Sequence, residues 1–82
     1  MITDFIYDNA SLTLSWIAEP NDIEFDIKIE YGQPANIFTL YLGPAFSVPF
    51  NLNIYDVPVN VEGSAKNPDG IWSPKNKKKL KE

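Results

Sequence analysis

The side chains of this sequence that are best placed for chemistry are four carboxylates on one strand-like segment, residues 22–31. Neighbours two residues apart on a strand face lie about 6.5–7 Å apart, which overlaps the separation of glycosidase carboxyl pairs. Catalysis would need one carboxyl group to be desolvated so that its pKa rises, and no apolar residue alternates onto this face. We therefore interpret it as a solvated face and predict no catalytic residue. The four carboxylates are Asp22, Glu24, Asp26 and Glu30.

The sequence lacks the side chains that other common catalytic and metal sites require. The chain has no histidine, cysteine or arginine, so serine and cysteine triads, the usual zinc sites and bidentate arginine contacts cannot be built. Asn21, Asp22 and Asp69 could offer oxygens to calcium, but no loop has the regular ligand spacing of a calcium loop. Turn chemistry explains Asp69 and Gly70 without a metal. The sequence predicts a protein that is not an enzyme and holds neither metal nor cofactor.

Length and composition indicate one domain. The 82 residues, 44% of them hydrophobic, suffice for one core and leave no second domain to form a cleft. Residues 1–4 lack the basic stretch and apolar run of a secretory signal, and no apolar run approaches the length of a membrane span. We expect a soluble protein that does not contact membranes.

Charge divides the chain into an acidic body, residues 1–74, and a lysine-rich tail, residues 75–82. The tail has five lysines against one glutamate, a charge of +4, whereas the body has two lysines against ten acids, a charge of −8. The tail could be a solubilising mobile end, a phosphate-binding arm or a segment that docks on an acidic protein surface. The acidic body opposes nucleic acid, so nucleic acid is an unlikely partner. The candidate contact residues in the tail are Lys75, Lys77, Lys78, Lys79 and Lys81.

Strict alternation of charged and apolar residues over 22–31 defines the elements that position these groups. Ile23, Phe25, Ile27, Ile29 and Tyr31 share one face, which is typical of an antiparallel strand with one buried side. Turn residues separate further strand-like runs, and no window has helical periodicity. We predict an all-β, seven-stranded antiparallel β-sandwich with Greek-key connections. The other expected strands are 2–7, 11–17, 36–42, 46–54, 57–65 and 71–73.

The alternation of side chains along each strand predicts which residues are buried in the core and which are on the surface. Trp16 shares its face with Leu12 and Leu14, so it is expected in the core. In the run 36–42, the residues Phe38, Leu40 and Leu42 are expected to point inward.

The residues on the other face of the run 36–42 are expected to point outward. Ile37 and Tyr41 lie on this face, which makes them candidate partner contacts. Ile71 and Trp72 are adjacent, so one of them is expected to face the core and the other to cover the open end of the sandwich or to contact a partner.

Two stretches together resemble fibronectin type III domains, which are immunoglobulin-like sandwiches. Residues 12–16, which end in Trp16, and the alternating segment 23–32 are similar to the B and C strands of that family. Residues 59–74 are similar to its F strand, turn and G strand. The resemblance covers nearly all of residues 2–74. Within the family, the sequence pattern is most similar to that of domains in bacteriophage tail and virion proteins. The family's tyrosine at the start of the F strand is replaced by Val59, so either Tyr55 supplies its bracing hydroxyl or the brace is missing.

The resemblance implies a non-enzymatic interaction module that is a structural component of a bacteriophage virion. It could be an auxiliary or decorating capsid protein, or a tail or neck protein. Its expected partners are other virion proteins or copies of itself, and host-surface or glycan binding is possible. The alternative is an accessory spacer or carbohydrate-binding fibronectin type III domain of a secreted bacterial enzyme.

Overall fold

The computed structural model describes residues 1–82, which form seven β-strands and one short 3-10 helix. Strands β1 and β2 are joined by a tight turn, and the short helix η1 lies between β5 and β6. In chain order the elements are β1 (Ile2–Asp8), β2 (Thr13–Ala18), β3 (Glu24–Tyr31), β4 (Asn36–Gly43), β5 (Ser47–Pro49), η1 (Leu52–Ile54), β6 (Val59–Lys66) and β7 (Asn76–Lys81).

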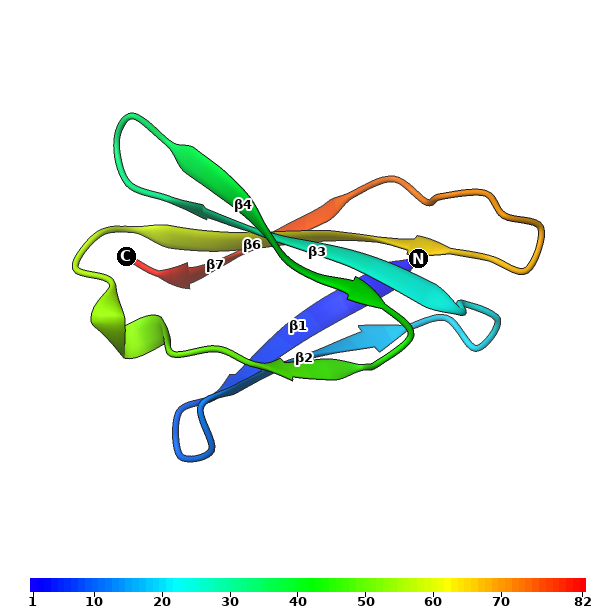
Figure 1. The fold of residues 1–82 in the computed structure, drawn as a ribbon, viewed down its shortest axis with the longest axis horizontal. Coiled ribbons are helices and arrows are strands. Elements are labelled where there is room, and N and C mark those ends of the chain that lie inside the picture. Colours follow the sequence, from blue (N-terminus) through cyan, green and yellow to red (C-terminus); the bar gives the residue numbers. More distant parts are fainter.

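The strands form two antiparallel sheets that pack face to face (Figure 1). One sheet has the order β1-β2-β5 and the other the order β4-β3-β6-β7. The inner faces of both sheets, together with Phe50 and Leu52 from the segment after β5, supply a single core of twelve buried hydrophobic residues. The predicted all-β architecture with two antiparallel sheets is confirmed at this level.

Strand β3 has the predicted phase. Phe25, Ile27 and Ile29 are fully buried, while the charged residues between them face solvent on the outer side of the sheet. Ile23 was expected in the core but is 52% exposed, because β3 begins only at Glu24 and the chain at Ile23 is still leaving the preceding turn.

Strand β2 carries Trp16 into the core as predicted. Trp16 is 3% exposed, and its ring packs against Phe25 with ring centroids 6.0 Å apart and against Tyr41 at 5.8 Å. Leu12 does not belong to this strand. It lies one residue before β2 with a φ of 52° and is only half-buried, because the turn from β1 passes through it.

The predicted phase of β4 is wrong beyond Leu40. Thr39 pairs with Lys28 and Tyr41 with Ile27, so Leu40 is an extra residue without a partner on β3. Such a bulge shifts the alternation by one residue. Tyr41 therefore turns inward against Trp16, and Leu42 turns outward and is 59% exposed, the reverse of the expected arrangement.

The predicted strand 46–54 is also shorter in the structure. Only residues 47–49 pair with β2, and the chain then turns into η1. One further backbone hydrogen bond follows Pro49, from the Phe50 N–H to the Leu12 carbonyl oxygen at 2.9 Å. Phe50 and Leu52 are buried as expected, whereas Phe46 and Ile54 are 55% and 69% exposed.

The seventh strand is not residues 71–73 but residues 76–81, within the segment that we expected to be a tail. Residues 71–73 make only one isolated bridge, between Lys66 and Trp72. The lysine-rich residues instead pair antiparallel with residues 59–63 of β6. The sandwich therefore extends past the predicted domain boundary at residue 74, because acidic and backbone partners supplied by other strands hold this segment.

Strand β7 closes one side of the sandwich by lying beside β1. The Asn76 side-chain amide donates to the Ile2 carbonyl oxygen at 3.0 Å across the two sheets. The sheets come close here because β6 has Gly63 at this point. A Cβ atom at Gly63 would lie 2.9 Å from side-chain carbons of Ile2 and Ile27. The opposite side, between β4 and β5, has no such closure.

Candidate interaction surfaces

The carboxylates of the outer face of the β3 sheet are engaged by lysines. Lys28 contacts Asp26 at 2.8 Å, and Lys77 on β7 reaches both carboxylate oxygens of Glu30 at 3.0 and 3.1 Å. Two further pairs are Lys66 with Glu24 at 3.5 Å and Lys75 with Glu62 at 3.6 Å. These carboxylates are therefore engaged in ion pairs on the outer face of the sheet.

Asp22, the fourth carboxylate of the predicted face, lies elsewhere. Its Oδ2 atom is 2.5 Å from the Met1 ammonium group, and its side chain is 6% exposed. It also accepts a hydrogen bond from the Glu19 backbone N–H at 3.2 Å. The structure therefore assigns Asp22 to the junction between the N-terminus and the β2–β3 turn.

The five lysines proposed as partner contacts all have partners within the chain. Besides the pairs of Lys75 and Lys77, Lys79 lies 3.5 Å from Glu82. Lys78 points toward the other sheet, where it reaches Asp4 Oδ1 at 3.0 Å and the Phe5 carbonyl oxygen at 2.8 Å. Lys81 donates to the Tyr55 carbonyl oxygen. Two of the five therefore join separate parts of the sandwich.

The Asp4–Lys78 contact makes stability depend on acid. The Lys78 ammonium, and after it the Phe5 backbone N–H at 2.8 Å, hold the pKa of Asp4 below its ordinary value. The pKa of Asp4 is thus lower in the folded state than in the unfolded state. The stabilisation of the fold by this contact is therefore present above about pH 4 and is lost as pH falls through the pKa of the folded state. Asp8, which accepts from the Ala10 N–H, has a lowered pKa and acts in the same direction.

We expect Asp4→Asn to flatten the acid side of the stability curve. Urea unfolding between pH 2 and pH 6 should show a smaller loss of stability in the variant than in the parent chain. Asp56→Asn is the matched control, because Asp56 is exposed and has no ion pair. Parallel curves for Asp4→Asn and the parent would contradict the contact.

An aromatic row lies on the open side of the sandwich. It runs Phe38, Tyr31, Tyr55, Phe50 and Tyr7, from β4 across to β1, with successive ring centroids 6.1, 5.1, 5.7 and 6.3 Å apart. Phe50 is buried and the other four rings are half-buried. Rings at these distances attract one another, so the row is a pre-formed surface with one side in solvent.

Tyr7 anchors the row. Its hydroxyl group donates to the Phe50 carbonyl oxygen at 2.8 Å and accepts from the Leu52 N–H at 3.1 Å. A tyrosine on β1 thus braces the segment between β5 and η1. The structure shows no hydrogen bond from the Tyr55 hydroxyl group, and Tyr55 contributes its ring to the row and its carbonyl oxygen to Lys81.

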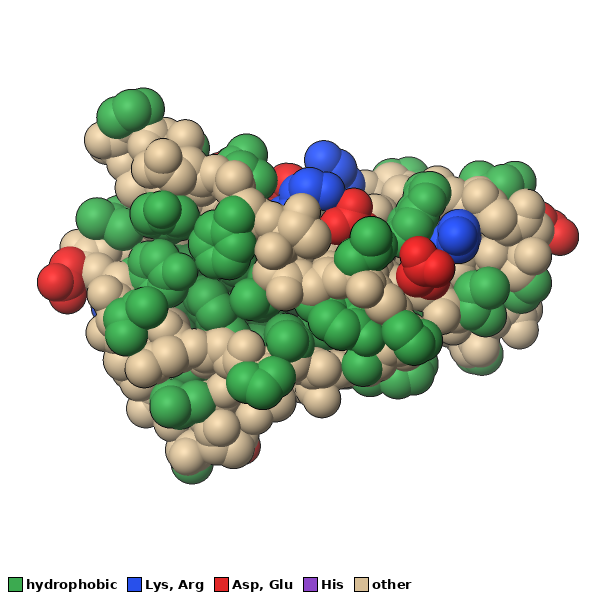
Figure 2. Space-filling view, viewed as in Figure 1, with side chains coloured by type: hydrophobic (Ala, Val, Ile, Leu, Met, Phe, Trp, Pro, Cys, Tyr) green, Lys and Arg blue, Asp and Glu red, His purple; other side chains and the backbone are tan.

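Figure 2 shows hydrophobic side chains gathered in the opening between β4 and the β5–η1 segment, where few charged side chains are visible. The exposed residues Ile37 and Ile54 are the chain neighbours of Phe38 and Tyr55, and they are 55% and 69% exposed. Ile37 is thus exposed as the sequence predicts. Ile37 lies on the outer face of β4, opposite to Phe38, and does not extend the row.

A second candidate surface is a cleft of about 420 Å³ at the end of the sandwich where the N-terminus lies. Ile71 and Trp72 line it and are 64% and 40% exposed, so neither covers the core as expected. The Lys66 ammonium lies 5.4 Å from the centre of the Trp72 ring. Asn67 lines the same cleft, and its side chain accepts from the N–H groups of Asp69 and Ile71.

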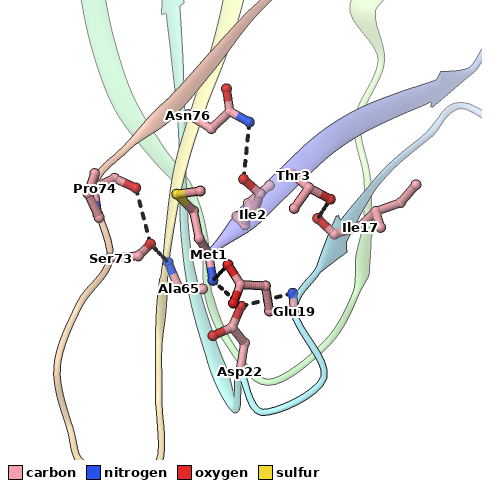
Figure 3. Close-up of polar contacts among 10 residues, drawn as sticks. All are labelled: Met1, Ile2, Thr3, Ile17, Glu19, Asp22, Ala65, Ser73, Pro74 and Asn76. Atoms are coloured by element: carbon pink, nitrogen blue, oxygen red, sulfur yellow. Dashed lines mark hydrogen bonds and ion pairs between the residues drawn. The ribbon is translucent and has the colours of Figure 1, made fainter.

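Polar contacts fix the wall of this cleft (Figure 3). The Met1 ammonium lies between Asp22 and Glu19, the latter at 3.4 Å. Desolvation lowers the pKa of this ammonium, but the hydrogen bonds and charges of the two carboxylates outweigh it and raise the pKa. The Ser73 hydroxyl oxygen accepts a hydrogen bond from the Ala65 N–H at 3.0 Å. This contact joins the segment after Trp72 to β6.

Sequence reasoning missed the aromatic row. Its members come from five separate segments, and nothing within each segment distinguishes them from the other aromatic residues there. The one available signal was the high aromatic content, 13% of a short chain.

Comparisons with family models, curated proteins and solved structures gave no match for this chain. The structure contains no helix with the length and apolar character needed to cross a membrane. It contains no cluster of three or more acidic, histidine or cysteine side chains arranged to hold a metal ion.

Proposed function

We propose that this chain is a non-enzymatic protein-interaction module that binds a protein partner on the aromatic row. The observation that carries the proposal is the row itself, five contiguous rings in which Tyr55 is preceded in the chain by the exposed Ile54. Tyrosine and phenylalanine are enriched at the centres of protein interfaces, since they bury much area at low entropic cost. The charged residues, by contrast, are largely engaged within the chain.

We propose further that the sandwich is fibronectin type III-like and serves as a structural component of a bacteriophage virion. It would be an auxiliary or decorating capsid protein, or a tail or neck protein. The resemblance of segments 12–16, 23–32 and 59–74 supports this, as does the division of the strands into β1-β2-β5 and β4-β3-β6-β7. Partners would be other virion proteins or copies of this chain.

Density-gradient purification of particles from the source of this sequence tests the virion proposal. Mass spectrometry should find the chain in the particle band at a fixed ratio to the major shell or tail protein. Its absence from intact particles would contradict the virion proposal and leave the interaction module to be tested separately.

Binding of the purified domain to particles that lack it tests the aromatic row. Ile54→Lys, beside Tyr55, should weaken binding by about tenfold or more, because a charge is desolvated at the interface centre. Ile71→Lys is the matched control, since Ile71 has a similar exposed fraction, 64% against 69%, but lies at the Trp72 cleft. Stronger loss from Ile71→Lys than from Ile54→Lys would move the interface to the cleft.

The cleft supports a second candidate function, carbohydrate binding by an accessory domain of a secreted enzyme. An exposed Trp72 beside the polar side chains of Asn67 and Asn21 offers an apolar platform with hydrogen-bonding groups. Because Trp16 is buried, a change of tryptophan fluorescence on adding oligosaccharides would report on Trp72. A change abolished by Trp72→Ala would favour this function over the virion proposal.

A further inference from the structure

Strand β4 has an unpaired edge. Its only neighbour in the sheet is β3, so alternate N–H and C=O groups of β4 point away from the sheet. None of the backbone hydrogen bonds made outside the regular strands uses a residue of 36–43. These groups can be satisfied only by water or by an added strand.

The composition of β4 does nothing to prevent strand addition. Proteins protect sheet edges with charges, prolines or very short strands. The β7 edge carries four lysines, β5 is three residues long and ends in Pro49, and β1 has Asp4 and Asp8. Residues 36–43 contain no charged residue and no proline. The edge of β4 is the one edge without such protection.

The bulge at Leu40 makes β4 complementary to itself. In an uninterrupted strand Ile37 and Leu42 would face opposite sides, but the bulge places both on the outer face, 55% and 59% exposed. It likewise places Phe38 and Tyr41 on the inner side. An antiparallel pairing about the midpoint of 36–43 then sets Ile37 opposite Leu42 of a second copy and Phe38 opposite its Tyr41.

We propose that β4 pairs with β4 of a second copy of this chain in a two-fold dimer. The β4-β3-β6-β7 sheets of the two copies join into one continuous sheet. Ile37, Phe38, Tyr41 and Leu42 then each meet an aromatic or aliphatic residue of the other copy, and each contact occurs twice about the axis, as in an isologous interface.

Charge does not oppose pairing at the β4 edge. The chain carries −4 overall, so copies repel one another, and the neutral edge keeps the acidic residues of the two molecules apart. The nearest acids, Asp26 and Glu30, lie on β3 opposite Leu42 and Ile37. Two strand spacings and the axis separate them from their counterparts by more than about 10 Å, where salt screens most of the repulsion.

The bulge also limits the strength of the dimer. It interrupts the edge, so pairing is confined to short runs on either side of Leu40. We therefore expect a small interface and a dissociation constant in about the micromolar to millimolar range.

Sedimentation equilibrium over a wide range of protein concentration tests the proposal. The parent chain should pass from monomer to dimer, and Ile37→Lys should weaken the dimer by about tenfold or more, since the two-fold axis repeats each lysine. Ile17→Lys is the matched control, because Ile17 is 50% exposed on the outer face of the other sheet. Ile54→Lys should also leave the dimer intact, which separates this result from the particle-binding assay.

Amide hydrogen exchange supplies the backbone readout. Exchange in residues 36–43 should slow as protein concentration rises, while exchange in β7 should not change. A parent chain that stays monomeric at millimolar concentration would overturn the proposal. A dimer that survives Ile37→Lys, or that Ile17→Lys weakens equally, would overturn it as well.

Discussion

Trp16→Ala is expected to remove a large part of the stability of the protein. Trp16 is almost fully buried and packs between Phe25 and Tyr41, so its truncation leaves a large cavity. Such substitutions cost about 3–5 kcal/mol, while a chain of this length has a total stability of only about 4–12 kcal/mol. Urea unfolding followed by circular dichroism should show a midpoint far below that of the parent chain.

Trp16→Phe is the control for this result. It keeps a ring against Phe25 and removes the indole Nε1–H, which is buried without a hydrogen-bond partner. An unpaired buried donor costs about 1–3 kcal/mol, so its removal offsets part of the lost packing. If Trp16→Ala were as stable as Trp16→Phe, the packing described around β2 would be wrong.

Removal of residues 75–82 is expected to abolish the native fold. The deletion takes away β7 and leaves the edge of β6 bare. It also removes three hydrogen bonds to distant backbone, from Asn76 to Ile2, Lys78 to Phe5 and Lys81 to Tyr55. Hydrogen bonds of this kind contribute about 0.5–3 kcal/mol each, so their sum is comparable with the total stability of about 4–12 kcal/mol.

A variant that changes only the charges distinguishes the contribution of strand β7 from that of its ion pairs. Substitution of Lys75, Lys77 and Lys79 by glutamine keeps β7 and removes exposed ion pairs, which are worth about 0.2–1 kcal/mol each. This variant should remain folded, with a dispersed amide spectrum in NMR. A truncated chain that folds as well as this variant would show that residues 75–82 are a dispensable tail.

The sequence predicted the fold correctly for strands that have one buried face and one exposed face. The alternation of β3 and the phase of Trp16 were sufficient because each depends on local pattern and a single core. The same reasoning failed at Leu40, since a bulge is decided by how β4 fits β3 and not by the composition of either strand. Tyr41 and Leu42 exchanged sides for that reason alone.

Strand β7 could not be predicted from its own residues. A segment with four lysines in six residues lacks an apolar face and has low strand propensity. It becomes a strand because β6 offers an open edge and because Glu30, Glu62 and Asp4 lie where its lysines emerge. These partners are 13 to 74 residues away in the sequence, so no local pattern reveals them.

The candidate site was predicted only in part. Ile37, Ile71 and Trp72 are exposed as partner contacts should be, whereas Tyr41 is turned toward Trp16 and the five lysines have partners within the chain. The aromatic row emerges only when the two sheets bring Tyr7, Tyr31 and Tyr55 to one side. Interaction sites assembled from several strands have this property, because spacing along the chain does not report distance across a sandwich.

Hydrogen–deuterium exchange of the domain, free and bound to purified particles, tests most directly that the chain is an interaction module that uses the aromatic row. We predict that binding slows exchange in residues 50–55 and around Phe38, and leaves residues 67–74 at the Trp72 cleft unchanged. Slower exchange in residues 67–74 without any change in residues 50–55 would contradict the account.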